Sequence, residues 1–422
     1  MIYPIYREHI ETEFVNSVLL TKDRYEFKLP NRDESCYVVW KDDDSYKIKT
    51  HYFIGVDWLE KGNRGIFVGS KLNFDKEGKN IREVDYLKML FTCLKYSDVA
   101  DSIGKTVLIR WDEPTIDINQ KDDVLTPFII MDFLNVVRSI VRKGLKKSYY
   151  KTTKTLNGRI KGKLLVKQTM QMHLSKGNML HNVCSFDEFD IDNKENRLLK
   201  KAIEFVKSYM SSSPLMKDAH AVSELVSFVS PAFEFVSSEI EVEDIKQMKS
   251  NTLFKEYDKG VRLAKMILKR FSYNISNTVE SKIPTPPFWI DMPILFELYV
   301  LSMLRDSFHD AVDYHTSTYG NELDFLLKGE KDNWVIDAKY IPSWKWGVVT
   351  DNVRQVSGYA RLKKVYTTLG IKYPTEIKCL IIYPDIEDGA SSFENVDFTA
   401  KENELTAYHG VYKLGVKIPV ID

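Results

Sequence analysis

The stretch of residues 321–340 constrains the fold most strongly, because its pattern predicts a β-hairpin. Two apolar runs, at 323–327 and 334–336, have the length and composition of short strands. The polar residues 329–332 lie between them and are typical of a turn. We therefore expect two antiparallel strands joined by a short connection.

This hairpin brings acidic side chains together. If the turn is centred between Glu330 and Lys331, Asp324 faces Asp337 on the opposite strand. Side chains alternate along a strand, so Asp337 and Lys339 share a face. Like charges opposite each other are destabilising unless something neutralises them. A divalent cation between the two carboxylates would do so, with Lys339 beside it to stabilise an anionic transition state.

The chain's length and element pattern predict a multidomain α+β or α/β protein. Its 422 residues are enough for two or three domains. We expect a β-rich docking or binding domain over residues 1–140 and a basic hairpin segment with a mostly helical domain over 141–283. An α/β core follows over 284–422. The proline-rich residues 282–287 are the predicted linker, because closely spaced prolines cannot continue a helix or a central strand.

Composition excludes several classes of protein. Lys and Arg number 60, as do Asp and Glu, so the chain has no overall basic field for polyanions. The four cysteines lack the spacing of a zinc site or a disulfide framework, which favours buried free thiols. The first residues have no signal-peptide pattern, and no apolar run is long enough to cross a membrane. We expect a cytoplasmic protein without membrane contact.

One segment breaks the charge balance. Residues 133–186 contain no Asp or Glu but many Lys and Arg, a pattern typical of a phosphate-binding surface. A solvated basic face or a surface for an acidic protein partner remains the alternative. The turn sequence Asn157-Gly158 predicts a tight hairpin from which the following basic side chains project. The candidates for binding DNA or a partner are Lys146, Lys147, Arg159, Lys161 and Lys163.

Two predicted helices flank the hairpin of residues 321–340. Asp291 is placed to cap the first, which carries Glu297 beside an apolar stripe. A carboxylate in that position is costly without a partner. The second helix places Gln355 and Tyr359 on one face, since they are four residues apart. Farther upstream, Asp192 and Glu195 predict a capping box.

The order of these residues resembles the PD-(D/E)xK nuclease superfamily. A helix with Glu297 is followed by strands with Asp324 and with Asp337-Ala338-Lys339, and then by a helix with Gln-x-x-x-Tyr. The sequence departs from the superfamily pattern in having Leu323, not proline, before the first aspartate. The resemblance implies a metal-dependent nuclease core at residues 284–422.

A wider resemblance covers most of the chain. Residues 156–160 (LNGRI), 186–189 (FDEF) and 195–200 (ENRLLK), followed by the nuclease core, are similar to the McrC family. These proteins are the endonuclease subunits of restriction systems directed at modified cytosine. The resemblance implies a GTP-hydrolysing AAA+ ring of McrB type as partner, double-stranded DNA with modified cytosine as substrate, and an N-terminal half that docks on the ring and stimulates its hydrolysis.

The expected reaction is metal-assisted hydrolysis of DNA phosphodiesters. Carboxylate oxygens suit Mg²⁺, with Mn²⁺ as the alternative ion, and no nucleotide is expected to bind this chain itself. The ion would be held by Asp324, Asp337, Glu297 and the backbone carbonyl of Ala338. Lys339 would orient the attacking water or stabilise the phosphorane, and Gln355 with Tyr359 would contact the phosphate or the neighbouring strand.

Two other functions remain open from the sequence. The chain can act chiefly as an adaptor and activator of an NTPase ring, with cleavage secondary or lost. It can also be a stand-alone repair or defence nuclease of RecB type. The intact acid pair with Lys339 argues against the first, and the long portion before residue 284 argues against the second.

Overall fold

The computed structural model divides the chain into two compact units. Unit 1 comprises Met1–Phe128, Leu215–Ala221 and Asn277–Asp422, and unit 2 comprises Ile129–Pro214 and Val222–Ser276. The structure describes all residues except 1–4, 15–19, 30–31, 44, 74–82, 94, 97–98, 100–101, 103–105, 111–112, 120–124, 213–219, 241–254, 277–281, 319, 330, 342–349 and 422. The proposed three-part division of the chain is finer than this and stays a prediction.

Unit 1 begins with two β-sheets, which agrees with the β-rich N-terminal region expected. The first sheet has the order β1-β7-β6-β15-β9, and the second has the order β2-β5-β4-β3. The first contains β1 (Ile5–Arg7), β6 (Phe53–Glu60), β7 (Arg64–Gly69), β9 (Val107–Ile109) and β15 (Phe288–Asp291), and the second contains β2 (Glu11–Glu13), β3 (Arg24–Lys28), β4 (Ser35–Asp42) and β5 (Ser45–Thr50).

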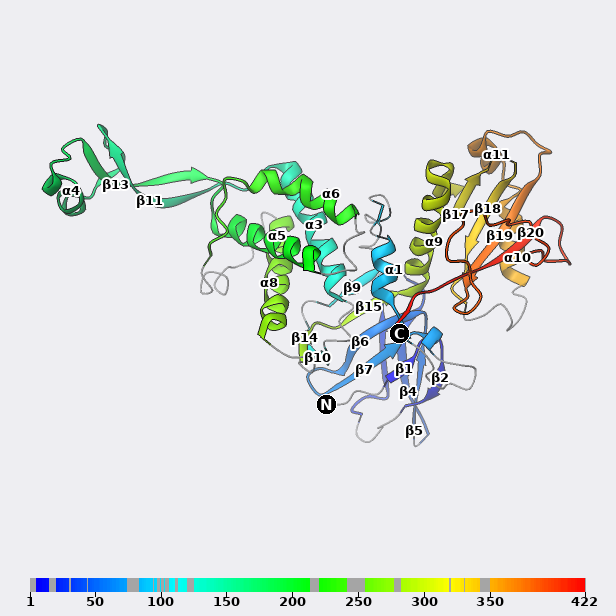
Figure 1. Cartoon of the computed structure of the whole chain (residues 1–422). Helices are drawn as coiled ribbons and strands as arrows, with labels where there is room; N and C mark the ends of the chain where they lie inside the picture. Colours follow the sequence, from blue (N-terminus) through cyan, green and yellow to red (C-terminus); the bar gives the residue numbers. More distant parts are fainter. Residues whose placement is uncertain are drawn as a thin grey trace. The chain divides into compact units, whose positions relative to one another are not determined.

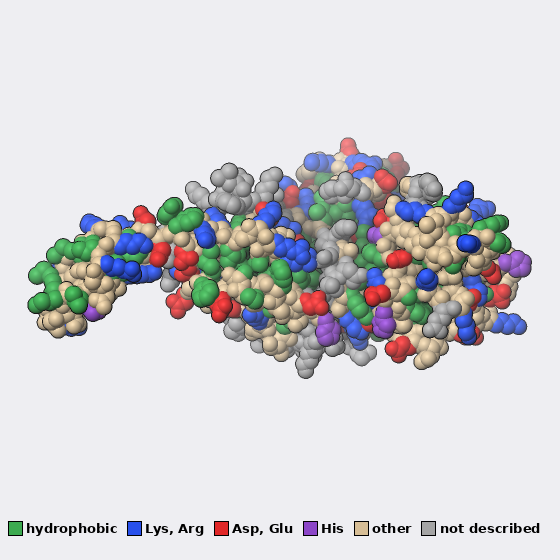
Figure 2. All heavy atoms as spheres, turned by 90° about the horizontal axis from the view of Figure 1, so that it is seen from above, with side chains coloured by type: hydrophobic (Ala, Val, Ile, Leu, Met, Phe, Trp, Pro, Cys, Tyr) green, Lys and Arg blue, Asp and Glu red, His purple; other side chains and the backbone are tan. Residues whose placement is uncertain are grey.

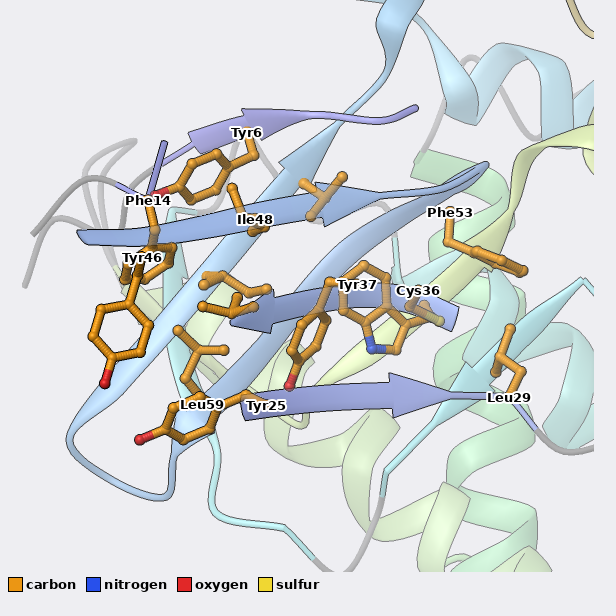
Figure 3. Close-up of a cluster of buried hydrophobic side chains, with 14 residues drawn as sticks. Tyr6, Phe14, Tyr25, Leu29, Cys36, Tyr37, Tyr46, Ile48, Phe53 and Leu59 are labelled. Atoms are coloured by element: carbon orange, nitrogen blue, oxygen red, sulfur yellow. The ribbon is translucent and has the colours of Figure 1, made fainter. Parts of the chain in front are cut away.

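Aromatic and β-branched side chains from both sheets form one core (Figure 3). Trp289 is fully buried within it, 5.7 Å from the ring of Tyr37. Its indole N–H donates to Asp57 Oδ2 at 3.0 Å. Because Trp289 belongs to β15, a strand far along the chain completes the N-terminal core.

The predicted linker at residues 282–287 is wrong. Strand β14 (Lys282–Thr285) pairs antiparallel with β10 (Ile116–Asn119), and β15 follows directly. Pro284 lies at the outer edge of a two-stranded sheet, where a missing N–H is tolerated. The partner strand is more than 150 residues away in sequence, so local composition could not indicate this pairing.

A second five-stranded sheet of unit 1 has the order β16-β17-β18-β19-β20. The first three strands are antiparallel neighbours, and β18, β19 and β20 run parallel. Helices α9 and α10 pack against this sheet (Figure 1). Its strands are β16 (Val312–Thr318), β17 (Asn321–Lys328), β18 (Asn333–Ala338), β19 (Ile377–Pro384) and β20 (Val411–Val416), with helices α9 (Met292–Phe308), α10 (Thr350–Tyr359) and α11 (Lys363–Leu369).

The expected hairpin is confirmed as β17 and β18. Phe325 pairs with Ile336 and Leu326 with Val335, which is the predicted register. The turn residue Glu330 lies outside the described residues. The side chains of these four paired residues are fully buried, so a slip of one residue would expose apolar groups.

Unit 1 also contains several short elements, some of which carry buried residues such as Lys71 and Leu90. Strand β21 pairs with β8, so the end of the described chain returns to the N-terminal region. Asp291 caps α9 as predicted, since its Oδ1 accepts from the Ile294 N–H at 3.2 Å. The elements are η1 (Lys71–Asn73), β8 (Glu83–Val84), α1 (Tyr86–Cys93), η6 (His309–Ala311) and β21 (Val420–Ile421).

Unit 2 contains a group of packed helices, as expected for the middle of the chain. Its elements include α3 (Leu125–Lys143), α5 (Lys194–Ser212), α6 (His220–Val229), η5 (Ser230–Phe233) and α8 (Lys255–Ser276), of which α3 and α6 begin in unit 1. The predicted capping box of Asp192 and Glu195 is wrong. Asn193 Oδ1 accepts from the Asn196 N–H at 3.0 Å, while Asp192 binds Arg197.

A two-stranded arm extends from these helices (Figure 1). It consists of β11 (Ser148–Asn157) and β13 (His181–Asp190), with β12 (Lys163–Leu164), α4 (Val166–Met172) and η3 (Leu174–Lys176) at its end. The predicted tight hairpin at Asn157-Gly158 is wrong, because Asn157 pairs with His181. Gly158 does turn the chain, with φ of 65°, but a long excursion precedes the return strand.

All four cysteines are buried free thiols, which agrees with the interpretation of their spacing. Among the helices in the described part of the chain, none is both long and apolar enough to cross a membrane.

The close approach of β6 and β15 gives a stability prediction. A Cβ added at Gly55 would lie 2.0 Å from the carbonyl oxygen of Phe288, so Gly55→Ala should separate the strands and cost more than about 2 kcal/mol. Gly62→Ala is the control. Gly62 also has a positive φ, but a Cβ added there would meet no atom within 4 Å. Thermal melts should show a large loss for the first variant and a small loss for the second. Equal losses would contradict a steric origin.

Candidate active site

The β17–β18 hairpin brings Asp324 and Asp337 together. The register that pairs Phe325 with Ile336 places the two aspartates opposite each other at the next step. Asp324 Oδ2 accepts a hydrogen bond from the Ala338 N–H at 2.8 Å. Asp337 is 1% exposed, and its Oδ1 has no hydrogen-bond partner among the described residues. Two acidic groups therefore share a site that leaves a buried oxygen unsatisfied.

Lys339 is the cation of this site. Its Nζ lies 2.8 Å from Asp337 Oδ2, and its backbone N–H donates to the Ile382 carbonyl on β19 at 2.8 Å. Burial alone would lower the pKa of Lys339, but the Asp337 and Asp324 carboxylates raise it above its ordinary value. Lys339 therefore stays protonated.

One lysine does not balance the acidic charge. Burial, followed by the charges of Asp337 and Glu297, raises the pKa of Asp324 well above 3.8. Burial also raises the pKa of Asp337. The charged form of the pair is thus disfavoured, and a bound cation would favour it.

Glu297, on α9, approaches the same site from another element. Its charge raises the pKa of both aspartates, although its side chain is engaged elsewhere. Glu297 Oε1 lies 2.6 Å from His315 Nε2. In the part of the chain that the structure describes, no three His, Cys, Asp or Glu side chains are arranged to hold a metal ion. The candidate metal site thus rests on the two aspartates alone, with Glu297 near them.

His315 was not among the residues predicted from sequence. The pairing of Tyr314 with Phe325 and of Thr316 with Leu323 places His315 opposite Asp324. Its φ is 52°, an uncommon value for a residue with a side chain. Only the register of β16 on β17 could have identified it, because a histidine nine residues from an aspartate carries no local signal.

The predicted face of α10 is confirmed for Gln355 and Tyr359. Gln355 Nε2 donates to the Tyr359 hydroxyl at 2.8 Å. Tyr359 lies near enough to Lys339 to affect its pKa. Gln355 is exposed and Tyr359 half-buried, so both can meet a ligand that approaches the aspartates from solvent.

The residues present fit a divalent cation. Two carboxylates face each other, that of Asp337 buried and that of Asp324 half-buried. One oxygen is unsatisfied, and the donors are the hard oxygens that Mg²⁺ or Mn²⁺ prefers. Asp324 and Asp337 would hold the ion. The roles predicted for the Ala338 carbonyl and for Glu297 as further ligands stay predictions.

The predicted basic residues belong to unit 2. Arg159, Lys161 and Lys163 are exposed on the arm, and Lys147 is exposed just before β11. The side chain of Lys146 is 13% exposed and its Nζ lies 2.6 Å from Glu195 Oε1, so it forms a structural ion pair. Their binding of DNA or a partner stays a prediction.

The end of the arm has an apolar surface that sequence reasoning missed. Figure 2 shows hydrophobic side chains gathered there, next to Lys and Arg. Met179 is 80% exposed and Leu180 68%. The exposed apolar side chains of this arm tip are Ile160, Val166, Met170, Met172, Leu174, Met179 and Leu180. A contiguous apolar surface of this kind is typical of a protein interaction site.

The acid pair gives a prediction about metal binding that needs no activity assay. Mg²⁺ should increase the free energy of unfolding by mass action, by about 2.7 kcal/mol at 100 times its Kd, and so raise the melting temperature of the chain. Asp337→Asn and Asp324→Asn should abolish this response, because each removes a ligand charge. Lys378→Met, which breaks the ion pair between β19 and Asp332 just before β18, should keep it. A full Mg²⁺ response in both Asn variants would contradict the site.

The same pair gives a pH dependence. Without metal, Asp324→Asn should be more stable than the wild type at neutral pH, because the folded-state pKa of Asp324 is raised above 3.8. A group whose pKa is higher in the folded state than in the unfolded chain stabilises the fold below its unfolded-state pKa. That contribution is lost as the pH rises through the folded-state pKa. The difference between the two proteins should therefore shrink as the pH falls toward 3.8, as calorimetry would show. A difference that grew on acidification would contradict the assigned direction.

Comparison with known proteins gives a family. Residues 105–367, more than half of the chain, match the family described as McrBC 5-methylcytosine restriction system component. No curated protein matches. A solved half-complex of Thermococcus gammatolerans McrB AAA+ hexamers with bound McrC is 14% identical, with a TM-score of 0.37, covering 99% of this chain and 94% of that chain. The cryo-EM structure of the Thermococcus gammatolerans McrBC complex is 15% identical, with a TM-score of 0.29, covering 72% and 87% respectively. The match over residues 105–367 confirms the resemblance noted in the sequence, and the chain belongs to the McrBC 5-methylcytosine restriction system component family.

Proposed function

We propose that this chain is the Mg²⁺-dependent DNA endonuclease subunit of a McrBC-type restriction system. The observation that carries the proposal is the Asp324–Asp337 pair, with Lys339 directly after the strand that carries Asp337. Family membership supports a restriction role. The substrate is double-stranded DNA with modified cytosine, and the partner is a GTP-hydrolysing AAA+ ring of McrB type whose hydrolysis this chain stimulates.

Each residue of the site has a defined task in this proposal. Asp324 and Asp337 hold the ion, and Glu297 either completes its shell or holds a bound water. Bound Mg²⁺ lowers the pKa of the attacking water and offsets charge on the scissile phosphate. Lys339, protonated beside Asp337, orients that water or stabilises the negative phosphorane. Gln355 and Tyr359 contact the phosphate or the neighbouring strand.

His315 contacts this site through Glu297. A hydrogen bond from His315 Nε2 to Glu297 would fix the orientation of that carboxylate. The strained backbone at His315 is consistent with a functional position, since such strain persists mainly where surrounding structure enforces it. We place His315 as an orienting residue for Glu297.

The arm of unit 2 is the proposed docking element for the ring. Its tip exposes methionine and leucine side chains beside lysines, and flexible methionines suit a surface that packs on a partner. The basic charge then meets either acidic groups of the ring or the DNA that the ring holds. The nuclease core in unit 1 would be brought to DNA through this attachment.

Cleavage tests the nuclease assignment. Asp337→Ala should abolish DNA cutting in the presence of the ring, GTP and Mg²⁺, because one metal ligand is lost. It should leave ring binding and stimulated GTP hydrolysis intact, since the arm is unchanged. The assay is cleavage of methylated plasmid beside GTP turnover. Retained cutting would show that this chain acts as an adaptor, and robust cutting by the purified chain alone would favour a stand-alone nuclease.

Docking is tested at the arm tip. Replacing both Met179 and Leu180 by Asp should weaken ring binding by at least about tenfold, because removal of central apolar contacts costs about 2 kcal/mol or more. GTPase stimulation should fall in parallel. Phe235→Asp is the matched control, since Phe235 is 83% exposed but lies in the helical part of unit 2. Unchanged binding by the double variant would contradict docking through the tip.

A further inference from the structure

The residue after Lys339 is anchored in the N-terminal region of unit 1. Tyr340 is 5% exposed, and its hydroxyl donates to Glu8 Oε1 at 2.6 Å and lies 2.8 Å from Ser70 Oγ. The Nζ of Lys71 donates to the Tyr340 carbonyl oxygen at 2.9 Å. Glu8 follows β1, while Ser70 and Lys71 follow β7. The first β-sheet thus fixes the backbone beside the candidate catalytic lysine.

These groups form one cluster around the buried Glu8 and Lys71 side chains. The Lys71 N–H donates to the same Glu8 Oε1 at 3.0 Å. The Lys71 ammonium lies 4.2 Å from the ring centroids of both Tyr52 and Tyr340. The ring of Phe296, the residue before Glu297 on α9, lies 6.0 Å from that of Tyr340. The cluster therefore touches two elements that carry site residues.

Burying such charged groups costs folding free energy that packing alone does not require. Glu8 is fully buried and Lys71 is 5% exposed. Burial raises the pKa of Glu8 and lowers the pKa of Lys71 to about 8. Apolar residues of similar volume often pack such a place with equal or better stability. The polar groups add directional hydrogen bonds, one of them to the backbone of Tyr340.

The hydrogen bond to the Tyr340 backbone helps to fix the position of Lys339. Alternation places Asp337 and Lys339 on one face of β18 and its continuation, with Tyr340 on the other. The Lys339 N–H donates to the Ile382 carbonyl, and the Lys339 carbonyl accepts from the Ile341 N–H at 2.8 Å. Because Lys71 and Glu8 bind Tyr340, the backbone on both sides of Lys339 is fixed. The long lysine side chain then starts from a defined position.

We propose that Glu8, Ser70 and Lys71 are positioning residues for Lys339, so that the N-terminal sheet is part of the catalytic apparatus and not only a docking domain. The inference rests on the proposed nuclease function and deepens it. Misplacing a catalytic group by about 1 Å can cost a hundredfold in rate. Loss of the Lys71 contact should therefore slow the chemical step without weakening substrate or metal binding.

Lys71→Met tests this in the full chain with its ring partner. The variant keeps side-chain length and loses the donor to Tyr340. The single-turnover cleavage rate at saturating DNA and Mg²⁺ should fall by about tenfold or more, with the Mg²⁺ midpoint and DNA affinity unchanged. Tyr340→Phe, which keeps the ring and the carbonyl contact, should lose less. Glu8→Gln retains an acceptor oxygen and should keep near-normal rates. Lys378→Met is the control for losing a lysine from the nuclease sheet.

Hydrogen exchange gives a readout independent of cutting. In Lys71→Met, the amides of residues 339–341 should exchange faster, while those of 377–384 on β19 should not. An unchanged cleavage rate, or a rate loss matched by lower Mg²⁺ affinity or a lower melting temperature, would overturn the positioning role. If Asp337→Ala and Lys339→Ala also kept full activity, the nuclease assignment itself would fail. Loss in those two variants with a normal Lys71→Met would refute only the positioning role.

Discussion

The repulsion between Asp324 and Asp337 is the constraint on which the candidate active site depends. A hairpin whose apolar residues are fully buried cannot slip, so it holds two carboxylates opposite each other despite the cost. Lys339 offsets only part of the charge. Burial is the largest cause that raises the pKa of both acids, and the charge of Glu297 adds to it. A site that disfavours its own charge would be stabilised by a bound cation, as the proposed metal-dependent chemistry requires.

The rest of unit 1 keeps that hairpin in place. The sheet around β18 continues through three parallel strands, and α9 and α10 bring Glu297, Gln355 and Tyr359 toward it. Strand β15 completes the N-terminal core just before α9 begins at the Asp291 cap. The N-terminal sheet and the sheet that carries the aspartate pair thus share a single compact unit, although residues of unit 2 separate them in sequence.

The parts that could be predicted from sequence are those set by local pattern. The register of Asp324 on Asp337 follows from two short apolar runs and one turn, and the Asp291 cap follows from adjacent residues. Nonlocal pairing could not be predicted. Residues 282–285 form a strand only because residues 116–119 lie beside them, and His315 enters the site only through β16. Asn157-Gly158 does turn the chain, but its partner strand begins at His181.

The most direct measurement of the central claim is a crystal structure of the chain soaked in Mn²⁺, with anomalous data collected at the manganese edge. We predict an anomalous peak within coordination distance, about 2.2 Å, of carboxylate oxygens from both Asp324 and Asp337. The peak should vanish in Asp337→Asn. A peak held by Glu297 and His315 without either aspartate, or one that survives the substitution, would contradict the account.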